Sequence, residues 1–476
     1  MSDDLLSCPI CCEQLREPKI LPKCGHTLCG DCTHRLGSSG HHSAACPLCR
    51  TRFRLVDVRP NFTVQAWLRE YDGAALPAPG LEAIPGRELV RDQVPVNLKA
   101  GRRKNLEFLG VPSQLAAAVA EEDGRIGKRI FLLDNSGSTA TYDGKMMFAT
   151  PSGGFATQAC TRWSEIKRMA MDHAEWNARL GTPCEFVLLN PAGPPPIQEG
   201  VDFARVDVNR GSVQAQIAAL QQMLDMTGPR GATPIAARVH EIGQRVAAES
   251  ASLASSGQRI ILVIITDGVP TDGVLTAGEA SLKQARIELA RVLRRVMSTL
   301  PINAVIRLCT DDENVINFYS DFEKDVELPL DVLDDPVGEA QEIREAGNGW
   351  FAYTQEIHRI REGGTFLKIL DLLDERRLTP VESALLAQLL LRDEDQSPLP
   401  RDPKEFCEEV ADIAAEASPV YCMRRRRMVP AVDATGLRVA ILGPWAFLVS
   451  LIPDFLNPLL VCKTLHSDTI HELPVL

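Results

Sequence analysis

The sequence predicts two folded parts of different kinds, a small metal-bound module at the amino terminus and a larger doubly wound α/β domain after it. The first prediction comes from the cysteines, because eight of the 14 lie within residues 1–49, and closely spaced cysteines are typical of metal sites. The second comes from apolar runs that alternate with amphipathic stretches beyond residue 126. That alternation is the pattern of strands and helices in a parallel sheet covered on both faces.

Length, charge and the amino terminus narrow the class of protein. A chain of 476 residues holds several domains, at roughly 100–200 residues per domain. The net charge of −12 argues against a nucleic-acid partner bound by bulk charge. Met1 is followed by Asp3 and Asp4 without a basic or apolar leader segment. We therefore expect an intracellular, cytoplasmic protein, in whose reducing surroundings clustered cysteines bind metal.

The amino-terminal cluster has the spacing C-x2-C-x12-C-x-H-x2-C-x2-C-x13-C-x2-C. Its eight candidate ligands are Cys8, Cys11, Cys24, His26, Cys29, Cys32, Cys46 and Cys49. Eight thiolate and imidazole ligands suffice for two tetrahedral Zn²⁺ sites, and closed sets of four leave no open position for chemistry. Structural zinc contributes roughly 10–16 kcal/mol, which a module this small needs in order to fold.

This spacing resembles a RING finger of the C3HC4 type. The segments 21–29, 46–50 and 59–61 further resemble the RING of tripartite-motif ubiquitin ligases. The resemblance stops near residue 72, because the second zinc box of those ligases does not follow. It implies a ββα module, residues 1–72, with two interleaved zinc sites. The implied ligand sets are Cys8, Cys11, Cys29 and Cys32 for one ion and Cys24, His26, Cys46 and Cys49 for the other.

The resemblance also implies an activity. RING fingers bind a ubiquitin-charged E2 enzyme and hold it in a reactive geometry, so that orientation accelerates transfer without a covalent intermediate on the ligase. The matching E2-binding positions are Ile10, Leu36, Pro47, Leu48 and Arg50. Alternatively, the apolar residues pack around zinc, the arginine is a solvated charge, and the finger is purely structural.

The α/β domain is predicted over residues 126–325. Its apolar runs at 130–133, 185–189, 260–265 and 302–308 are apolar at nearly every position, as expected of strands buried on both faces of a parallel sheet. Helix-spaced apolar residues lie between the runs: Ile235, Val239, Ile242 and Val246 in one segment, and Leu282, Leu289, Val292 and Val296 in another.

A second site is predicted at the ends of these strands. The run 130–133 leads into Asp134, Ser136 and Ser138, and two further loops hold Thr233 and Asp267. Hard oxygen ligands of this kind suit Mg²⁺ or Mn²⁺, and the loops fall where open α/β sheets bind ligands. The three loops together resemble the metal-ion-dependent adhesion site of von Willebrand factor A (vWA) domains.

The resemblance to vWA domains implies a Rossmann-like fold and one divalent ion ringed by Asp134, Ser136, Ser138, Thr233 and Asp267. It also implies that an acidic residue of a protein partner completes the shell. Without the ion, Thr233 would serve as a helix cap and Asp267 as part of a turn. The glycine-rich insertion 139–160 follows the first loop and could cover the site.

The remaining segments carry weaker patterns. Residues 73–125 are predicted as a linker and 326–425 as a mostly helical extension, in which Thr379 begins a helix with Pro380 in its first turn. Residues 426–476 form an apolar tail. Its uncharged stretch 439–453 is shorter than the ~20 residues of a spanning helix, so weak membrane-surface contact or a packed terminal element are the alternatives.

The function predicted from these features is that of a RING-type E3 ubiquitin-protein ligase. Ubiquitin would pass directly from an E2 to a protein substrate, which the vWA domain would select through its metal. Two alternatives remain: a non-catalytic scaffold built from a zinc finger and a vWA domain, and an accessory subunit of an ATPase complex.

Overall fold

The computed structural model divides the chain into two compact units, Met1–Asp92 and Gln93–Leu476. Each unit is described by itself. The residues that the structure describes are 8, 10, 15–21, 27–37, 43–47, 51–54, 58–60, 101–150, 154–272, 279–326, 328, 330–393 and 396–443.

The first unit contains short strands around one helix. Its elements are β1 (Lys19–Ile20), β2 (Thr27–Leu28), α1 (Gly30–Gly37), β3 (Ser43–Ala45), β4 (Arg52–Arg54) and β5 (Arg59–Pro60). Strand β1 pairs with β2 and with β5, and β3 pairs with β4, all antiparallel. The described core consists of four cysteines and four larger apolar residues, Leu15, Leu21, Leu28 and Phe53. So small an apolar core is consistent with a fold that metal stabilises.

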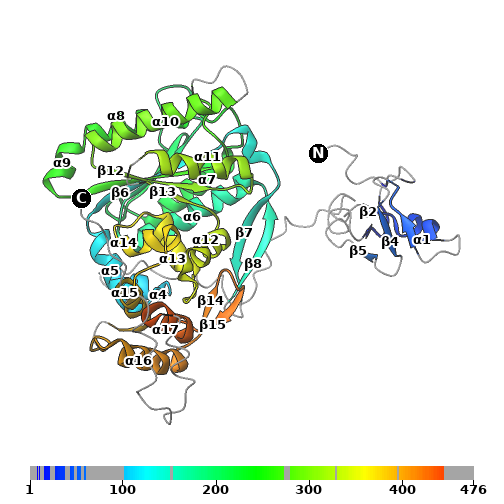
Figure 1. Cartoon of the computed structure of the whole chain (residues 1–476). Coiled ribbons are helices and arrows are strands. Elements are labelled where there is room, and N and C mark those ends of the chain that lie inside the picture. Colours follow the sequence, from blue (N-terminus) through cyan, green and yellow to red (C-terminus); the bar gives the residue numbers. More distant parts are fainter. Residues whose placement is uncertain are drawn as a thin grey trace, which may run out of the picture. The chain divides into compact units, whose positions relative to one another are not determined.

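The second unit is built on a six-stranded mixed sheet (Figure 1). In sheet order the strands are β10 (Phe203–Val206), β9 (Cys184–Leu188), β6 (Ile126–Leu133), β11 (Arg259–Thr266), β12 (Ile302–Leu308) and β13 (Leu330–Leu333). All neighbours run parallel except β10, which is antiparallel to β9. The sheet belongs to the Rossmann-like α/β class, as the sequence predicts.

Helices cover both faces of the sheet. One face packs against α8 (Ile235–Ala247), α10 (Glu279–Thr299) and α11 (Glu313–Val326), and the other against α6 (Arg162–Leu180) and α7 (Val213–Met226). Successive strand residues alternate between the two cores: Ile130 joins the first and Phe131 the second. Burial on both faces explains why the four predicted strands read as continuous apolar runs.

Two details of the sheet differ from the sequence prediction. The edge strands β10 and β13 had not been predicted, and β13 extends the sheet past residue 325 to Leu333. On α10, Leu289, Val292 and Val296 are buried as predicted, whereas Leu282 is 42% exposed. Leu282 lies near the start of α10, ahead of the part of the helix that the core covers. The predicted face of α8 is buried throughout.

A third apolar core lies among the helices outside the sheet. Its elements are α4 (Gly101–Phe108), α5 (Ser113–Asp123), α12 (Pro336–Ile343), α13 (Gln355–Glu362), α14 (Lys368–Glu375), α15 (Pro380–Leu391), α16 (Pro403–Glu416) and α17 (Ala434–Leu442). Residues 101–123 are therefore not linker, because Leu106, Leu115 and Val119 are buried in this core. Thr379 begins α15 with a capping box, which confirms the predicted helix start.

Residues 137–160 lie between β6 and α6, outside the six-stranded sheet. They form a short 3₁₀ turn, η4 (Gly137–Ala140), and a hairpin of β7 (Gly144–Ala149) and β8 (Phe155–Cys160). In Figure 1 the hairpin extends toward a second hairpin made by β14 (Val420–Cys422) and β15 (Arg427–Val429). Tyr421 joins the two, because its hydroxyl donates to the carbonyl of Phe155 at 3.3 Å.

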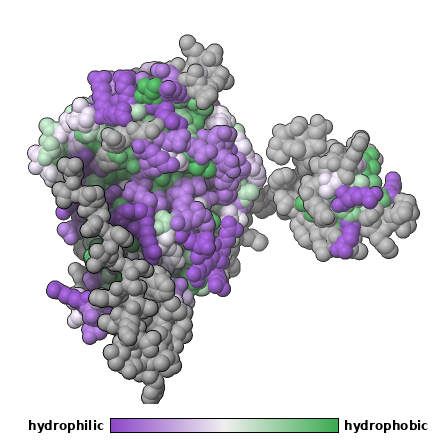
Figure 2. Space-filling view, viewed as in Figure 1, coloured by the Kyte–Doolittle hydropathy of each residue, from purple (hydrophilic) through white to green (hydrophobic). Residues whose placement is uncertain are grey.

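The carboxyl-terminal tail is described only in part. Strand β15 and helix α17 belong to the folded unit, and residues 444–476, which hold most of the apolar stretch, lie outside the described residues. Among the helices that the structure describes, none has the length and apolarity needed to cross a membrane. Figure 2 shows a largely hydrophilic surface on the described residues of the second unit, with apolar residues interspersed.

Candidate functional site

Three cysteines in the first unit come together as one group. The sulfur atoms of Cys8, Cys29 and Cys32 lie within 4.8 Å of one another, and all three residues are buried. Helix α1 begins at Gly30, so Cys29 lies just before the helix and Cys32 in its first turn. Backbone N–H groups point at the sulfurs: Arg16 donates to Cys29 at 3.2 Å and Cys29 to Cys8 at 3.5 Å. Buried sulfurs that accept N–H bonds are a suitable donor set for zinc.

This grouping brings Cys8, from the first pair of predicted ligands, together with Cys29 and Cys32, the third pair, across 21 residues of chain between Cys8 and Cys29, as interleaved sites require. Cys11, the predicted fourth ligand, lies outside the described residues. Of the second predicted set, Cys46 is described and buried. Cys24, His26 and Cys49 lie outside the described residues.

The predicted E2-binding residues differ in exposure. Ile10 is 38% exposed, and Pro47 is also exposed. Leu36 is half-buried and packs against the cysteine-containing core, so part of its side chain serves packing. Leu48 and Arg50 lie outside the described residues.

The sequence of this unit matches a known family. Residues 8–49 match the model of the C3HC4-type zinc finger family, the RING finger. The first unit therefore contains a RING finger, which implies zinc binding.

Individual relatives resemble the chain over the same short region. The chain is 34% identical to the RING finger protein nhl-1 of Caenorhabditis elegans over 71 residues, 14% of this chain and 7% of that protein. It is 52% identical to human E3 ubiquitin-protein ligase TRIM56 over 50 residues, 10% of this chain and 6% of the relative. Human E3 ubiquitin-protein ligase TRIM32 is 37% identical over 67 residues, 13% of this chain and 10% of the relative. The chain thus spans a tenth or less of the length of these relatives.

A second candidate site lies in the other unit, at the carboxyl ends of two central strands. The sheet order reverses between β6 and β11, since the chain proceeds outward to β10 on one side and to β13 on the other. Ligands of open α/β sheets bind at such a reversal. Asp134 directly follows β6 and Asp267 directly follows β11, so the two carboxylates meet at this point.

Short hydrogen bonds connect four of the five predicted oxygen ligands. The Asp134 carboxylate accepts from the Ser136 N–H at 2.8 Å. The hydroxyl oxygens of Ser136 and Ser138 lie 3.0 Å apart, and Ser138 donates to Asp267 Oδ1 at 2.9 Å. Asp134 and Asp267 are each 1% exposed. Side chains separated by 129 residues in the sequence therefore form one cluster of oxygen atoms, which is buried at the two aspartates and at Ser136 and exposed at Ser138.

Thr233, the fifth predicted ligand, borders the same cluster. A Cβ built on Gly268 would lie 3.8 Å from both Thr233 Oγ1 and Ser138 Oγ, so both hydroxyls face Gly268. Two backbone bonds join the Thr233 loop to the first loop, from Gly137 N–H to Gly231 O at 3.1 Å and from Arg230 N–H to Asn135 O at 2.7 Å. All three loops thus converge.

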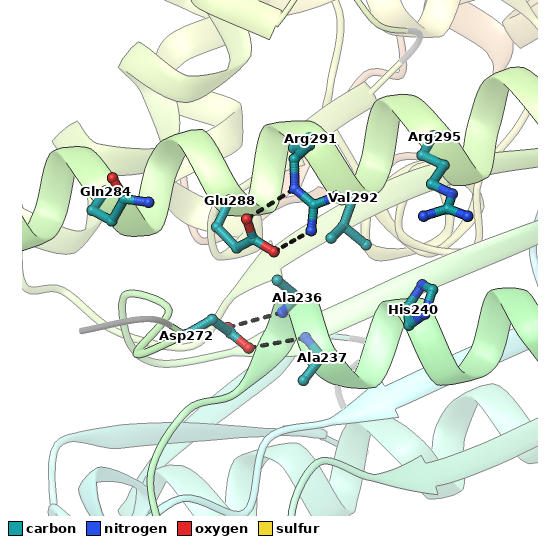
Figure 3. A pocket seen from close by; sticks show the side chains of 9 residues that line it. All are labelled: Ala236, Ala237, His240, Asp272, Gln284, Glu288, Arg291, Val292 and Arg295. Atoms are coloured by element: carbon teal, nitrogen blue, oxygen red, sulfur yellow. Dashed lines mark hydrogen bonds and ion pairs between the residues drawn. The ribbon is translucent and has the colours of Figure 1, made fainter. Parts of the chain in front are cut away.

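Helix α8 anchors the Thr233 loop from the other side (Figure 3). Asp272 accepts from the N–H groups of Ala236 and Ala237, both at 2.9 Å, and so caps the first turn of α8. The backbone N–H of Thr233 donates to Thr271 Oγ1 at 3.0 Å. Figure 3 shows the two bonds to Asp272 at one end of a groove of about 370 Å³ between α8 and α10. The loop after β11 therefore fixes both Asp267 and Thr233.

The electrostatics of the cluster are dominated by its two buried carboxylates. Burial raises the pKa of Asp134 to about 6, the hydrogen bond from Thr266 opposes this, and the neighbouring Asp267 carboxylate raises it further. Two buried carboxylates this close repel each other unless a positive charge lies between them. The cluster offers hard oxygen atoms only, so its chemistry fits Mg²⁺ or Mn²⁺.

Sequence reasoning missed several residues that organise this cluster. The buried Asn135 donates to Asn190 O at 2.9 Å and accepts from Asn190 N–H at 2.7 Å, which ties the loop after β9 to the site. Thr266 donates to Asp134 Oδ2 at 2.6 Å. Arg162 forms an ion pair with Asp267 at 3.0 Å. Asn135 and Thr266 are neighbours of predicted ligands in the sequence, whereas Asn190 and Arg162 come from other elements, which no local motif signals.

Two other polar regions contain ion pairs between their own side chains. A cavity of about 750 Å³ lies beneath the β7–β8 hairpin, beside α6, α12 and α13. At its edge, Lys145 pairs with Asp311 at 2.8 Å and with Asp335 at 3.2 Å. Elsewhere, carboxylate oxygens of Glu339, Glu342 and Asp374 lie within 4.8 Å of one another. Arg361 pairs there with Glu339 at 2.6 Å and with Asp374 at 2.9 Å, so a guanidinium supplies the counter-charge.

Proposed function

We propose that this protein is a RING-type E3 ubiquitin-protein ligase whose second unit selects a protein substrate. The observation that carries the proposal is the RING finger at residues 8–49, with Cys8, Cys29 and Cys32 grouped as one zinc site requires. Relatives of this segment are E3 ubiquitin-protein ligases. The exposed Ile10 supports a docking role, because zinc and a small core do not use its whole side chain.

The ligase would act by positioning. Ile10, Leu36, Pro47 and Leu48 would contact the E2, and Arg50 would bridge E2 and ubiquitin. Holding the charged E2 in one reactive conformation raises the rate of attack by a substrate lysine, since orientation is then settled before reaction. The zinc ligands would be the two predicted sets, and zinc would hold the docking loops in place.

The second unit would be a vWA domain with a metal-ion-dependent adhesion site. Support comes from the strand order with its reversal at β6 and β11, and from the convergence of five oxygen ligands there. Asp134, Ser136, Ser138, Thr233 and Asp267 would hold Mg²⁺ or Mn²⁺ directly or through water. The cation would give an acidic residue of a protein substrate a partner for its carboxylate.

Autoubiquitination with a panel of E2 enzymes tests the ligase proposal. We expect activity with at least one E2 and its loss in Ile10→Ala. Ile287→Ala is the matched control, because Ile287 on α10 is also an exposed isoleucine, at 52%, and should leave activity unchanged. Absence of activity with every E2 would contradict the ligase and favour a binding scaffold. So would an Ile10→Ala variant as active as the parent.

Thermal unfolding tests the cation site. When the free ion is present at about 100 times its Kd, binding stabilises the folded state by about 2.7 kcal/mol. Mg²⁺ or Mn²⁺ should therefore raise the melting temperature of the second unit. Asp134→Ala should abolish the shift. Asp225→Ala, which removes an exposed carboxylate paired with Lys167, should retain it. Equal melting of the parent protein with Mg²⁺ and with EDTA would contradict the site.

A further inference from the structure

Arg162 lies between a carboxylate of the cation site and a carboxylate outside it. Its Nη1 is 3.0 Å from Asp267 Oδ2. The other edge of the guanidinium donates two hydrogen bonds to Asp143, from Nε to Oδ1 and from Nη2 to Oδ2, both at 2.7 Å. Arg162 is the first residue of α6, and its side chain is only 11% exposed. One guanidinium therefore bridges Asp267 and Asp143.

The backbone holds this bridge in register. Arg162 N–H donates to Thr141 O at 3.0 Å. A Cβ on Gly144 would lie 2.9 Å from Arg162 N and from Thr161 O, so the chain beside Asp143 approaches the start of α6 as closely as only glycine permits. Asp143 and Arg162 are thus fixed neighbours, whereas Asp267 belongs to a separate loop after β11.

The contacts at Asp267 leave little room for a second cation's charge. Its side chain is fully buried, and its two oxygens already accept from Ser138 and from Arg162. A buried carboxylate requires a compensating charge, and Arg162 supplies it here. A divalent ion among Asp134, Ser138 and Asp267 would lie within a few ångströms of the guanidinium, and like charges beside two buried carboxylates repel each other.

We propose that Arg162 is an internal counter-cation that sets the affinity of this site for divalent ions by exchange. The inference rests on the proposed cation site. Without the ion, Arg162 neutralises Asp267. When the ion binds, Arg162 gives up Asp267 and keeps its bidentate pair with Asp143, which serves as its holding partner. With the ion bound, the guanidinium of Arg162 would pair with Asp143 alone, in the segment between η4 and β7.

The proposal predicts opposite effects for two substitutions. Arg162→Gln removes the competing charge, so Mn²⁺ should bind at least about tenfold more tightly, ~1.4 kcal/mol. Asp143→Asn removes the holding partner, so ion binding would leave Arg162 unpaired and the affinity should fall several-fold. Arg168→Gln is the matched control, because Arg168 lies on the same helix and pairs with Asp172 instead. Its affinity for Mn²⁺ should equal that of the parent.

The test is titration of the full zinc-containing chain with Mn²⁺, followed by the paramagnetic resonance of the free ion and by calorimetry, with melting curves as the check of folding. If neither the parent nor Arg162→Gln binds Mn²⁺, the cation site itself is refuted. If the parent binds, Asp134→Ala does not, and Arg162→Gln matches the parent, the site stands and exchange is overturned. Tighter binding by Asp143→Asn would overturn the holding role, and this variant decides the matter if Arg162→Gln does not fold.

Discussion

Glu362 joins the sheet to the helical part of the second unit, and its replacement by alanine gives a quantitative test of the fold. Glu362 is the last residue of α13, and its side chain is 3% exposed. Its Oε1 accepts from Arg307 Nε on β12 at 2.9 Å and lies 3.0 Å from His358 Nε2. Although burial opposes it, His358, His173 and Arg359 hold the pKa of Glu362 well below its usual range.

The magnitude follows from what the substitution leaves behind. The side chain of Arg307 is also 3% exposed, and Glu362→Ala removes the carboxylate that is nearest to its guanidinium. Glu165 remains only at 3.9 Å. Breaking a buried ion pair at one partner costs about 3–5 kcal/mol, because the remaining charge stays buried without compensation. We expect a loss of that size in the free energy of unfolding of the second unit.

Urea unfolding of the full chain, followed by tryptophan fluorescence, measures this loss. Trp163, Trp176 and Trp350 are buried in the second unit and report its transition. Glu199→Ala is the control, because Glu199 pairs with Arg210 at the surface with both side chains over 40% exposed. Such pairs contribute at most about 1 kcal/mol. A Glu362→Ala cost no larger than that of the control would refute the reasoning.

Three further predictions follow from individual features. Burial lowers the pKa of His173 to about 4. Because the imidazole binds a proton more tightly in the unfolded chain, the free energy of unfolding should be intact above about pH 6.5 and fall by up to about 3 kcal/mol toward pH 4. A free energy of unfolding in urea that does not change over this pH range would contradict the prediction. Gly364→Ala should cost more than about 2 kcal/mol, since φ is +72° and its Cβ would lie 2.5 Å from Ile261. Gly257→Ala, with φ +66° and open space, should cost about 1–2 kcal/mol, and equal losses would refute the packing argument. Chelation of zinc should unfold the first unit, because bound zinc contributes roughly 10–16 kcal/mol to the stability of such a module. Unchanged hydrogen exchange over residues 27–37 after chelation would contradict this prediction.

The central strands were predictable because a residue buried on either face must be apolar, and β11 reads as six apolar residues in succession. The edge strands escaped prediction for the same physical reason. Strand β10 contains Arg205 and β13 contains Asp331, both only half-buried, so neither reads as a continuous run. Helices α4 and α5 were missed because both are short and lie in a segment that follows a proline-rich stretch.

The candidate cation site divides in the same way. The candidate ligands were predictable because Asp134, Ser136 and Ser138 form a local motif directly after a strand. The counter-charge was not, since Arg162 lies 105 residues from Asp267 and reaches it only through the start of α6. Spacing along the chain identifies donor atoms that share a loop. It carries no information about which charge a separate element brings to them.

The discharge of ubiquitin from a charged E2 onto free lysine tests the central claim most directly, because it needs neither a substrate protein nor the second unit. With the E2 found active in the panel, the full chain should accelerate discharge well above the E2 alone, and Ile10→Ala should return it to that level while Ile287→Ala does not. A chain that leaves the discharge rate unchanged, although its RING finger retains zinc, would contradict the proposed ligase.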